Sequence, residues 1–349
     1  MDLLTDVRSS AAAQRLGSSQ WLRRLAVLSL VMNIVIIITG GLVRLTDSGL
    51  GCPTWPQCTP GAYTPHPALG VHGAIAFGNR LITFILMIVA LLTWFSALLH
   101  RRPDGSPDRK LRWLTFAIGL GIPFQGVIGG ITVLTHLNPY VVGLHMLNSL
   151  VLVCLATWLV RLTWPAPAKQ VGPKTRLLSL VTFALAWVVV SLGTVVTGSG
   201  PHAGDVKAVR TGLNPYDISH LHSFSVYLLT AATIVSIIVL RNRAAVLLLI
   251  IELAQGGIGF AQYFSNLPAQ LVILHIAGAA GTIALAASLL CSVARSSRVP
   301  AAAIQAGDSR CEGRPSHSRP GHLSRSLHAD SSASSGAGLA LGRSTGRSI

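Results

Sequence analysis

Eight apolar segments constrain the fold of this 349-residue chain more than any other feature of its sequence. A helix that crosses a lipid bilayer needs about 20 consecutive apolar residues. Segments of about this length or longer run over residues 24–43, 72–99, 113–135, 140–161, 177–198, 217–240, 244–264 and 269–293. The sequence therefore predicts an all-α integral membrane protein with eight transmembrane helices.

Basic residues indicate how these helices are oriented. Arg23 and Arg24 precede the first segment, and further Lys and Arg residues follow each even-numbered segment. By the positive-inside rule we expect a multi-pass protein of the plasma (inner) membrane with both termini in the cytoplasm. The formal net charge of +16 arises mostly from these residues and from the tail. No aromatic residues alternate with a basic patch, so the expected partner is the lipid bilayer and not a nucleic acid.

An internal repeat organises the segments. Gln125 stands twenty residues before His145, and Gln255 stands twenty residues before His275, each followed by glycines and an apolar run. A spacing shared by two membrane hairpins indicates a duplicated unit. We therefore expect two pseudo-symmetric four-helix bundles.

The boundaries of these two halves follow from composition. We expect an N-terminal half at 21–164, which includes an outer loop at 45–70, and a C-terminal half at 177–293. A Pro-rich cytoplasmic linker at 165–176 joins them. The lead at 1–20 and the tail at 294–349 are poor in large apolar residues, so we expect both to be disordered and cytoplasmic.

Each even-numbered segment carries a histidine a few residues past its outer end: His72, His145, His222 and His275. A single intramembrane histidine more often joins helices than binds a metal. Four at matched depth, two in each half, favour heme iron held between facing helices. A zinc site usually adds carboxylates or thiolates close by, and a proton relay would distribute its rings through the depth of the membrane.

Two arginines stand in unusual places. Arg44 lies at the outer end of the first segment, against the basic bias, and either snorkels to the interface or binds an anion. Arg80 is expected about 15 Å below the outer surface, where a structural ion pair with Glu252 is one alternative. We predict that Arg44 or Arg80 contacts a heme propionate or another anion, because Arg pairs with carboxylates bidentately.

The outer loop contains Cys52 and Cys58, with five residues between them. On an oxidising face such a pair forms a disulfide, binds a soft metal, or stays as two thiols. The prolines between the cysteines suit a tight ring and favour the disulfide.

Several motifs closely resemble the heme A synthase family. The most specific is Gly-Gly-Leu-Val-Arg-Leu-Thr-Asp-Ser-Gly-Leu-Gly-Cys-Pro-Thr-Trp-Pro-Gln-Cys at 40–58. The others are Val-Thr-Gly-Ser-Gly-Pro-His-Ala-Gly-Asp at 196–205, Gly-Leu-His-Met at 143–146, Leu-His-Ser at 221–223 and Leu-His-Ile-Ala-Gly at 274–278. The resemblance covers residues 21–293.

The resemblance implies an oxidoreductase that converts the C8 methyl group of heme O into a formyl group, giving heme A for terminal oxidases. It implies a heme b between His222 and His275, a substrate heme on His145, and a disulfide between Cys52 and Cys58. The implied partners are heme O synthase, as the supplier of heme O, and terminal oxidase assembly. It does not identify the electron donor.

The second segment departs from the family pattern. Ala76 stands where the family usually has Glu, and Asn79 stands where it has a His that is followed by Arg. His72 lies two turns earlier on the same helical face and is the one replacement ligand that the sequence offers. The catalytic residue is therefore unassigned, and the enzyme either turns over slowly, uses another acid, or is inactive.

Two other functions compete with this one. A di-heme b-type membrane cytochrome would transfer electrons without modifying heme, but it should ligate both irons on both faces. The contrast between His222 with His275 and the altered Ala76 with Asn79 favours the enzyme. A transporter built from repeats would more often use broken helices at the midplane.

Overall fold

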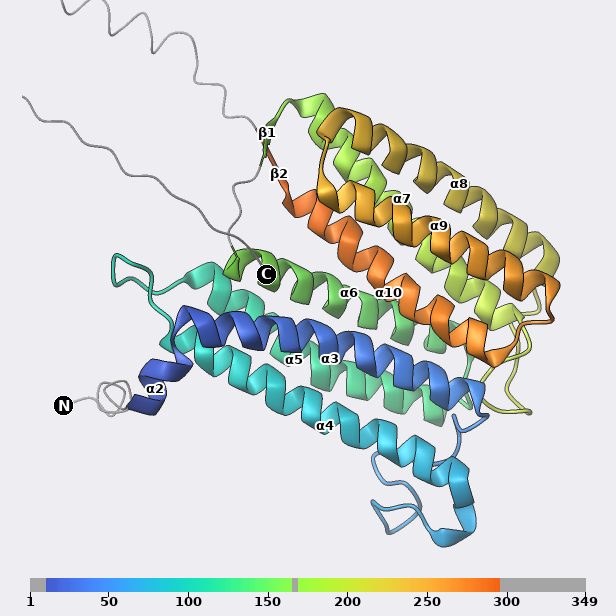
Figure 1. Cartoon of the computed structure of the whole chain (residues 1–349). Coiled ribbons are helices and arrows are strands. Elements are labelled where there is room, and N and C mark those ends of the chain that lie inside the picture. Colours follow the sequence, from blue (N-terminus) through green and yellow to red (C-terminus); the bar gives the residue numbers. More distant parts are fainter. Residues whose placement is uncertain (1–10, 165–168, 296–349) are drawn as a thin grey trace, which may run out of the picture. The chain divides into compact units, whose positions relative to one another are not determined.

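Eight long helices make up most of the computed structural model, which describes residues 11–164 and 169–295. Their bounds are α3 (Ser19–Leu45), α4 (Gly70–Leu99), α5 (Arg109–Leu134), α6 (Pro139–Thr163), α7 (Pro173–Ser199), α8 (Pro215–Leu240), α9 (Arg243–Phe264) and α10 (Ala269–Cys291) (Figure 1). All eight are long and apolar enough to cross a membrane. The prediction of an all-α protein with eight spans is confirmed, and the chain is a multi-pass membrane protein.

Local sequence signals set where several helices begin. At α6 the side chain of Asn138 accepts a hydrogen bond of 3.0 Å from the backbone N–H of Tyr140, with proline between them. At α8 Asn214 caps Tyr216 in the same way, also at 3.0 Å. Asn is a favoured N-cap residue and Pro suits the first helical position. The same Asn-Pro-Tyr signal therefore starts two of the histidine-bearing helices.

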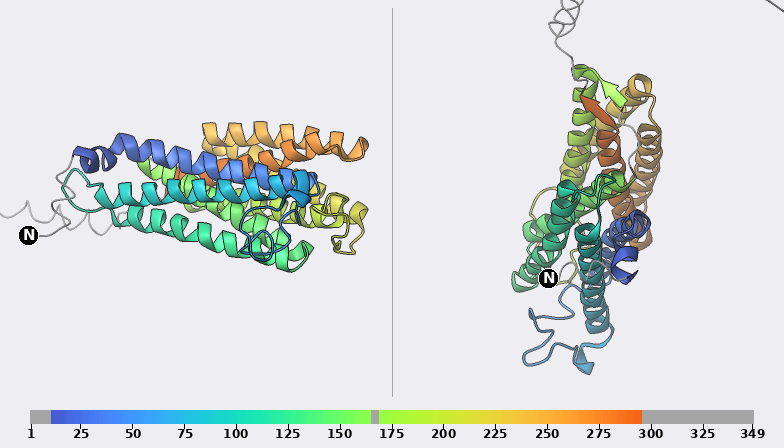
Figure 2. Two further views of the ribbon diagram at one scale, coloured as in Figure 1. Left: turned by 90° about the horizontal axis from the view of Figure 1, so that it is seen from below. Right: turned by 90° about the vertical axis from the view of Figure 1, so that its left-hand side faces the viewer.

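The helices form two sets of four, and within each set every helix contacts the next and the last contacts the first. Figure 2 shows the helices lying side by side. The first set runs α3–α4–α5–α6 and back to α3, and the second runs α7–α8–α9–α10 and back to α7. The two sets also contact each other, because α10 packs against α3 and α6, and α6 packs against α7. The division into two pseudo-symmetric bundles, at 21–164 and 177–293, stays a prediction.

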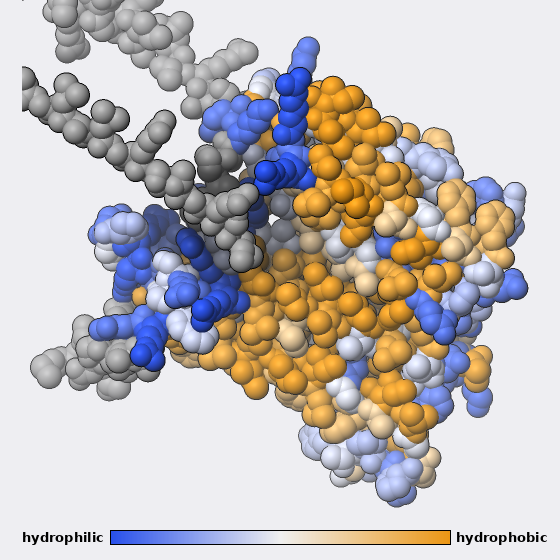
Figure 3. All heavy atoms as spheres, viewed as in Figure 1, coloured by the Kyte–Doolittle hydropathy of each residue, from blue (hydrophilic) through white to orange (hydrophobic). Residues whose placement is uncertain are grey.

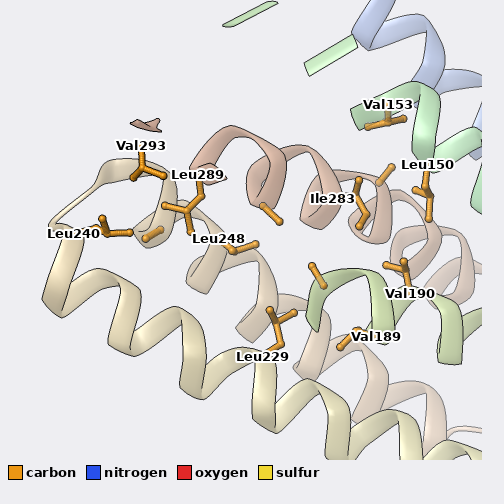
Figure 4. Packing of buried hydrophobic residues seen from close by; sticks show 14 of the residues in the cluster. Leu150, Val153, Val189, Val190, Leu229, Leu240, Leu248, Ile283, Leu289 and Val293 are labelled. Atoms are coloured by element: carbon orange, nitrogen blue, oxygen red, sulfur yellow. The ribbon is translucent and has the colours of Figure 1, made fainter. Parts of the chain in front are cut away.

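The largest buried apolar cluster lies mainly within the second set and reaches α6 and α3 of the first. It includes Leu150 of α6, Val190 of α7, Leu229 of α8, Leu248 of α9 and Ile283 of α10 (Figure 4). Large apolar side chains also cover the outside of the helices, and Figure 3 shows them in the middle of one face with polar residues toward the helix ends. An apolar exterior of this kind is what a lipid bilayer requires.

Short elements extend the structure beyond the predicted spans. A helix, α2 (Ala11–Leu16), lies within the lead at 1–20 that was expected to be disordered, and α7 begins inside the predicted linker at 165–176. Strand β1 (Lys169–Val171) pairs in parallel with β2 (Val293–Arg295), at the start of the predicted tail. Residues 1–10, 165–168 and 296–349 lie outside the described residues, so the disorder predicted for 1–10 and for the tail beyond 295 stays a prediction.

The outer loop between α3 and α4 contains a short 3-10 helix, η1 (Pro67–Leu69), and the Cys52–Cys58 disulfide. Both cysteines are buried and pack against Ala76 of α4. The disulfide prediction is confirmed. Ala76, at the position where the resemblance leads one to expect Glu, is thus packed against this disulfide.

Arg80 of α4 binds the backbone of the loop that the Cys52–Cys58 disulfide closes. Its guanidinium donates hydrogen bonds of 2.9–3.5 Å to the carbonyls of Cys52, Thr54, Pro56 and Gln57. These acceptors take the place of an acid partner.

Glu252 had been suggested as that acid partner, and this suggestion is wrong. Its carboxylate accepts a hydrogen bond of 2.8 Å from the hydroxyl of Thr233 instead. Arg80 therefore satisfies its donors without an ion pair.

Replacing Arg80 with Gln should loosen the loop, because most of these hydrogen bonds to a charged donor are lost. We expect the local free energy of opening over residues 52–57 to fall by about 2 kcal/mol, measured by amide hydrogen exchange. Arg102→Gln is the control, since Arg102 forms an exposed ion pair of 3.1 Å with Asp108. Equal exchange in the Arg80 variant and the control would contradict the assignment.

Peptide mass spectrometry without reduction should recover Cys52 and Cys58 as one linked peptide. Cys154 and Cys291 are free in the structure and serve as internal controls. Reduction should destabilise the loop by roughly 2 kcal/mol, because a small ring constrains the unfolded chain only modestly. Two free thiols in freshly isolated membranes are the outcome that excludes the bond.

Candidate functional site

The repeated glutamines lie opposite the repeated histidines. In the first copy the side-chain amide of Gln125 donates a hydrogen bond of 2.7 Å to the backbone carbonyl of His145. It also donates to Ser149, and Asn148 donates to its side-chain oxygen. The twenty-residue spacing therefore places Gln125 across from the helical turn that begins with the histidine.

The second copy is built more loosely. Gln255 donates to the carbonyl of Leu274, one residue before His275, at 3.5 Å. Gly278 stands where the first copy has Asn148, and the side-chain oxygen of Gln255 is buried without a partner among the described residues. The common function of the glutamine is to join the two helices of its hairpin beside the histidine.

His222 of α8 is oriented by the backbone of α7. Its Nδ1 lies 3.1 Å from the carbonyl oxygen of Val189. A carbonyl can only accept, so Nδ1 carries the proton and Nε2 has a free lone pair. A metal-binding histidine usually donates its other ring N–H in this way.

His145 and His275 have unsatisfied ring nitrogens. In both residues Nδ1 is buried and has no hydrogen-bond partner among the described residues. Buried polar atoms are normally paired. The two rings are therefore polar groups that the surrounding helices alone do not satisfy.

The structure brings His222 and His275 together. Their ring centroids lie 6.4 Å apart, with ring planes at 78°. A metal–imidazole bond is about 2 Å long and the ring nitrogen lies roughly 1 Å from the ring centre, so two rings on opposite sides of one iron have centroids about 6 Å apart. Two imidazoles on opposite faces are also how a helix bundle holds a heme. The pair therefore has the spacing that a bis-histidine heme requires.

No larger ligand set competes for this place. In the chain from 11 to 164 and from 169 to 295, no group of three or more His, Cys, Asp or Glu residues lies close enough to hold a metal ion. Two histidines are the donors that this site offers. Heme iron accepts two axial ligands because the porphyrin supplies the remaining four.

His72 is placed differently from the other three histidines. It is exposed, and its Nδ1 lies 3.0 Å from the hydroxyl of Ser48. Two turns further along α4, the side-chain oxygen of Asn79 accepts a hydrogen bond of 2.8 Å from Thr39 of α3. His72 and Asn79 thus share a helical face, as predicted. That face is directed toward α3 and the chain that follows it.

The outer loop reaches the surroundings of His145. A side chain added at Gly130 of α5 would come within 2.4 Å of the Trp55 ring, so Trp55 packs on the backbone of α5. The neighbouring Gly129 contacts the His145 ring in the same manner. The disulfide ring therefore lies over the part of α5 that faces His145.

Arg44 joins the outer ends of the two halves of the sequence. It donates to the carbonyl of His202 and, at 2.7 Å, to that of Thr197 at the end of α7. His202 in turn donates from Nε2 to the carbonyl of Leu267 in the α9–α10 turn, at 2.9 Å. Sequence reasoning missed this connection, although the motif Pro201-His202-Ala203-Gly204-Asp205 stands out in the sequence.

Comparison with known proteins identifies the family. The family described as Cytochrome oxidase assembly protein (COX15-CtaA) matches residues 23–69 and 71–206, which is more than half of the chain. A protein named Heme A synthase from Shewanella oneidensis is 30% identical over 193 residues, covering 51% of this chain and 55% of that protein.

Two further relatives carry the same name. The Heme A synthase of Lysinibacillus sphaericus is 30% identical over 137 residues, covering 38% of this chain and 41% of that protein. That of Geobacillus thermodenitrificans is 29% identical over 113 residues, covering 32% and 33%. The chain spans about half or less of the length of these relatives. The family match itself extends from α3 to the loop after α7, and the chain therefore belongs to the Cytochrome oxidase assembly protein family, COX15-CtaA.

Proposed function

We propose that this protein is a heme A synthase, an oxidoreductase that oxidises the C8 methyl group of heme O to a formyl group and gives heme A for terminal oxidases. Family membership and the names of its relatives direct attention to this reaction. The observation that carries the proposal is the 6.4 Å pair of His222 and His275. A family of this function requires a heme site within the membrane, and this pair has the spacing to provide one.

In this proposal His222 and His275 hold a permanently bound heme b. When bound, a heme of this kind supplies one-electron redox chemistry through its iron. The chain contributes the orientation of its ligands, because the Val189 carbonyl keeps the proton of His222 on Nδ1 and leaves Nε2 for the iron. The 6.4 Å between the centroids of His222 and His275 is also a distance at which two rings pack edge to face without a metal. The orienting hydrogen bond of His222 favours metal binding over simple packing.

His145 is the proposed ligand of the substrate, heme O. Gln125 and Ser149 fix the turn of α6 that carries it. His72 is the one candidate for the opposite face, but its ring is exposed and its Nδ1 is engaged by Ser48. A substrate heme held firmly from one side can be released after oxidation, which a heme held by two imidazoles cannot do readily.

Arg44 and Arg80 are proposed to attract the propionates of the two hemes. Both are partly buried, Arg44 in the last turn of α3 and Arg80 about three turns into α4, and both donate to backbone carbonyls. Neither has an acid partner among the described residues, so each keeps its positive charge uncompensated. A guanidinium in such a place attracts carboxylates.

The cellular setting follows from the same proposal. We place the protein in the plasma (inner) membrane with both termini in the cytoplasm, so that the disulfide loop faces the oxidising side. Heme O synthase would deliver the substrate, and terminal oxidase assembly would consume the product. A di-heme cytochrome is not favoured, because Asn79 bonds to Thr39 and His72 to Ser48, while His222 and His275 face each other.

Replacing His222 or His275 with Ala should abolish the low-spin bis-imidazole spectrum of the bound heme b. The reason is that each variant removes one of two axial ligands. The matched control is His220→Ala on the same helix, since His220 is exposed and stacks on Tyr216 with ring centroids 4.1 Å apart. An unchanged spectrum in both ligand variants would remove the assignment.

Purified protein supplied with heme O, dioxygen as the oxidant and a reductant should form heme A, identified by pigment extraction. We expect His145→Ala to abolish this conversion and His72→Ala to retain it, because the His72 ring is directed to Ser48. Loss of conversion in His72→Ala instead would make His72 a ligand. No heme A from the unsubstituted protein would discard the enzyme proposal.

A further inference from the structure

Three of the four hairpins formed by α3 to α10 share one contact. In each, a glycine on the first helix faces the imidazole of the histidine on the second: Gly129 faces His145, Gly193 faces His222, and Gly259 faces His275. In every case the nearest ring atom is Cε1. The first and third of these glycines hold the same position in the repeat, four residues after the glutamine.

The three glycines differ in how much room they leave for a side chain. A Cβ added at Gly129 would lie 3.0 Å from Cε1 of His145, and one added at Gly193 would lie 3.3 Å from Cε1 of His222. Both distances are shorter than ordinary van der Waals contact, so the ring would have to move. At Gly259 the corresponding distance is 3.7 Å, which is an ordinary contact.

Glycines elsewhere in these helices do not share this feature. Gly126 and Gly256 directly follow the repeated glutamines, and nothing lies within 4 Å of a Cβ added at either. In the first hairpin, Gly40 also faces open space, and Gly41 faces Ile273 and Ile276 of α10. The contact therefore accompanies an intramembrane histidine and is not a general property of helix packing in this protein.

The chemistry of the ring explains why this contact matters. Cε1 lies between the two ring nitrogens, so a backbone pressed against Cε1 limits the directions in which both nitrogens can point. His222 shows the result. Gly193 meets its Cε1 while the carbonyl of Val189, one helical turn earlier, accepts from its Nδ1. Nε2 is the nitrogen that remains for a ligand.

We propose that Gly129 and Gly193 are positioning residues for His145 and His222, and that the absent side chain sets the angle at which Nε2 meets a heme iron. Gly259 leaves room for a methyl group beside His275 and has no such role. This inference rests on the heme sites of the proposed function. It differs from that proposal because it concerns how the rings are held and not which rings bind. The graded distances predict that alanine disturbs His145 most, His222 next and His275 least.

The test uses full-length protein loaded with heme. Gly193→Ala and Gly259→Ala act on opposite ligands of one heme b, so each serves as the comparison for the other. Outer-sphere changes weaken metal binding by roughly 10- to 100-fold. We expect Gly193→Ala to weaken heme b retention about tenfold and to shift its midpoint potential, while Gly259→Ala behaves as the unsubstituted protein. In the other half, Gly129→Ala should weaken heme O binding in a titration.

Gly126→Ala and Gly256→Ala are the matched controls for each half, and both should leave heme binding and potential unchanged. Alanine favours a helix over glycine, so loss of heme is not expected from a weakened helix. Thermal unfolding of each variant checks that the fold is retained. If Gly193→Ala leaves heme b retention and midpoint potential unchanged, and Gly129→Ala leaves heme O binding unchanged, this inference is overturned while the proposed function stands. Absence of heme from the unsubstituted protein would overturn the proposed function, and the inference with it.

Discussion

A polar ring inside an apolar helix must find partners within the protein, because the bilayer offers none. The helices around His145, His222 and His275 are arranged to meet this demand. In the α7–α8 hairpin the carbonyl of Val189 meets the ring of His222. In the α5–α6 hairpin the side-chain amide of Gln125 meets the backbone at His145, and the backbone at Gly129 meets its ring. In His145 and His275 the helices leave Nδ1 without a partner among the described residues, so the demand of these two rings is met only in part.

The two copies of the repeat satisfy this demand to different degrees. Gln125 is engaged on both its amide and its oxygen, through His145, Ser149 and Asn148. Gln255 keeps one long hydrogen bond and an unpaired oxygen, because Gly278 replaces the asparagine. One copy thus ties the backbone at its histidine into a connected polar network, while the histidine of the other copy lies beside a facing ring. In the proposed function the two units serve two different hemes, which gives them a reason to diverge in this way.

Sequence alone predicted the eight helices because apolar length is a local property that tertiary context does not alter. The twenty-residue spacing also predicted that Gln125 and His145 belong to one unit, although not that they bond. The partner of Arg80 could not be predicted, since backbone carbonyls carry no sequence signal, and the acid named in their place, Glu252, bonds to Thr233. The same limit applies to Val189, whose contribution to His222 is its carbonyl and not its side chain. The spacing of the glycines was visible, but not which of them faced a ring.

The anchoring of the outer loop has a consequence for how freely its sequence can vary. Arg80 donates hydrogen bonds to the segment from Cys52 to Gln57, and all the acceptors are main-chain oxygens. Every residue type carries such an oxygen, so these hydrogen bonds to Arg80 do not depend on which side chains the segment carries. The loop can therefore change what it presents to the outside, in evolution or in the laboratory, without changing where it is fastened.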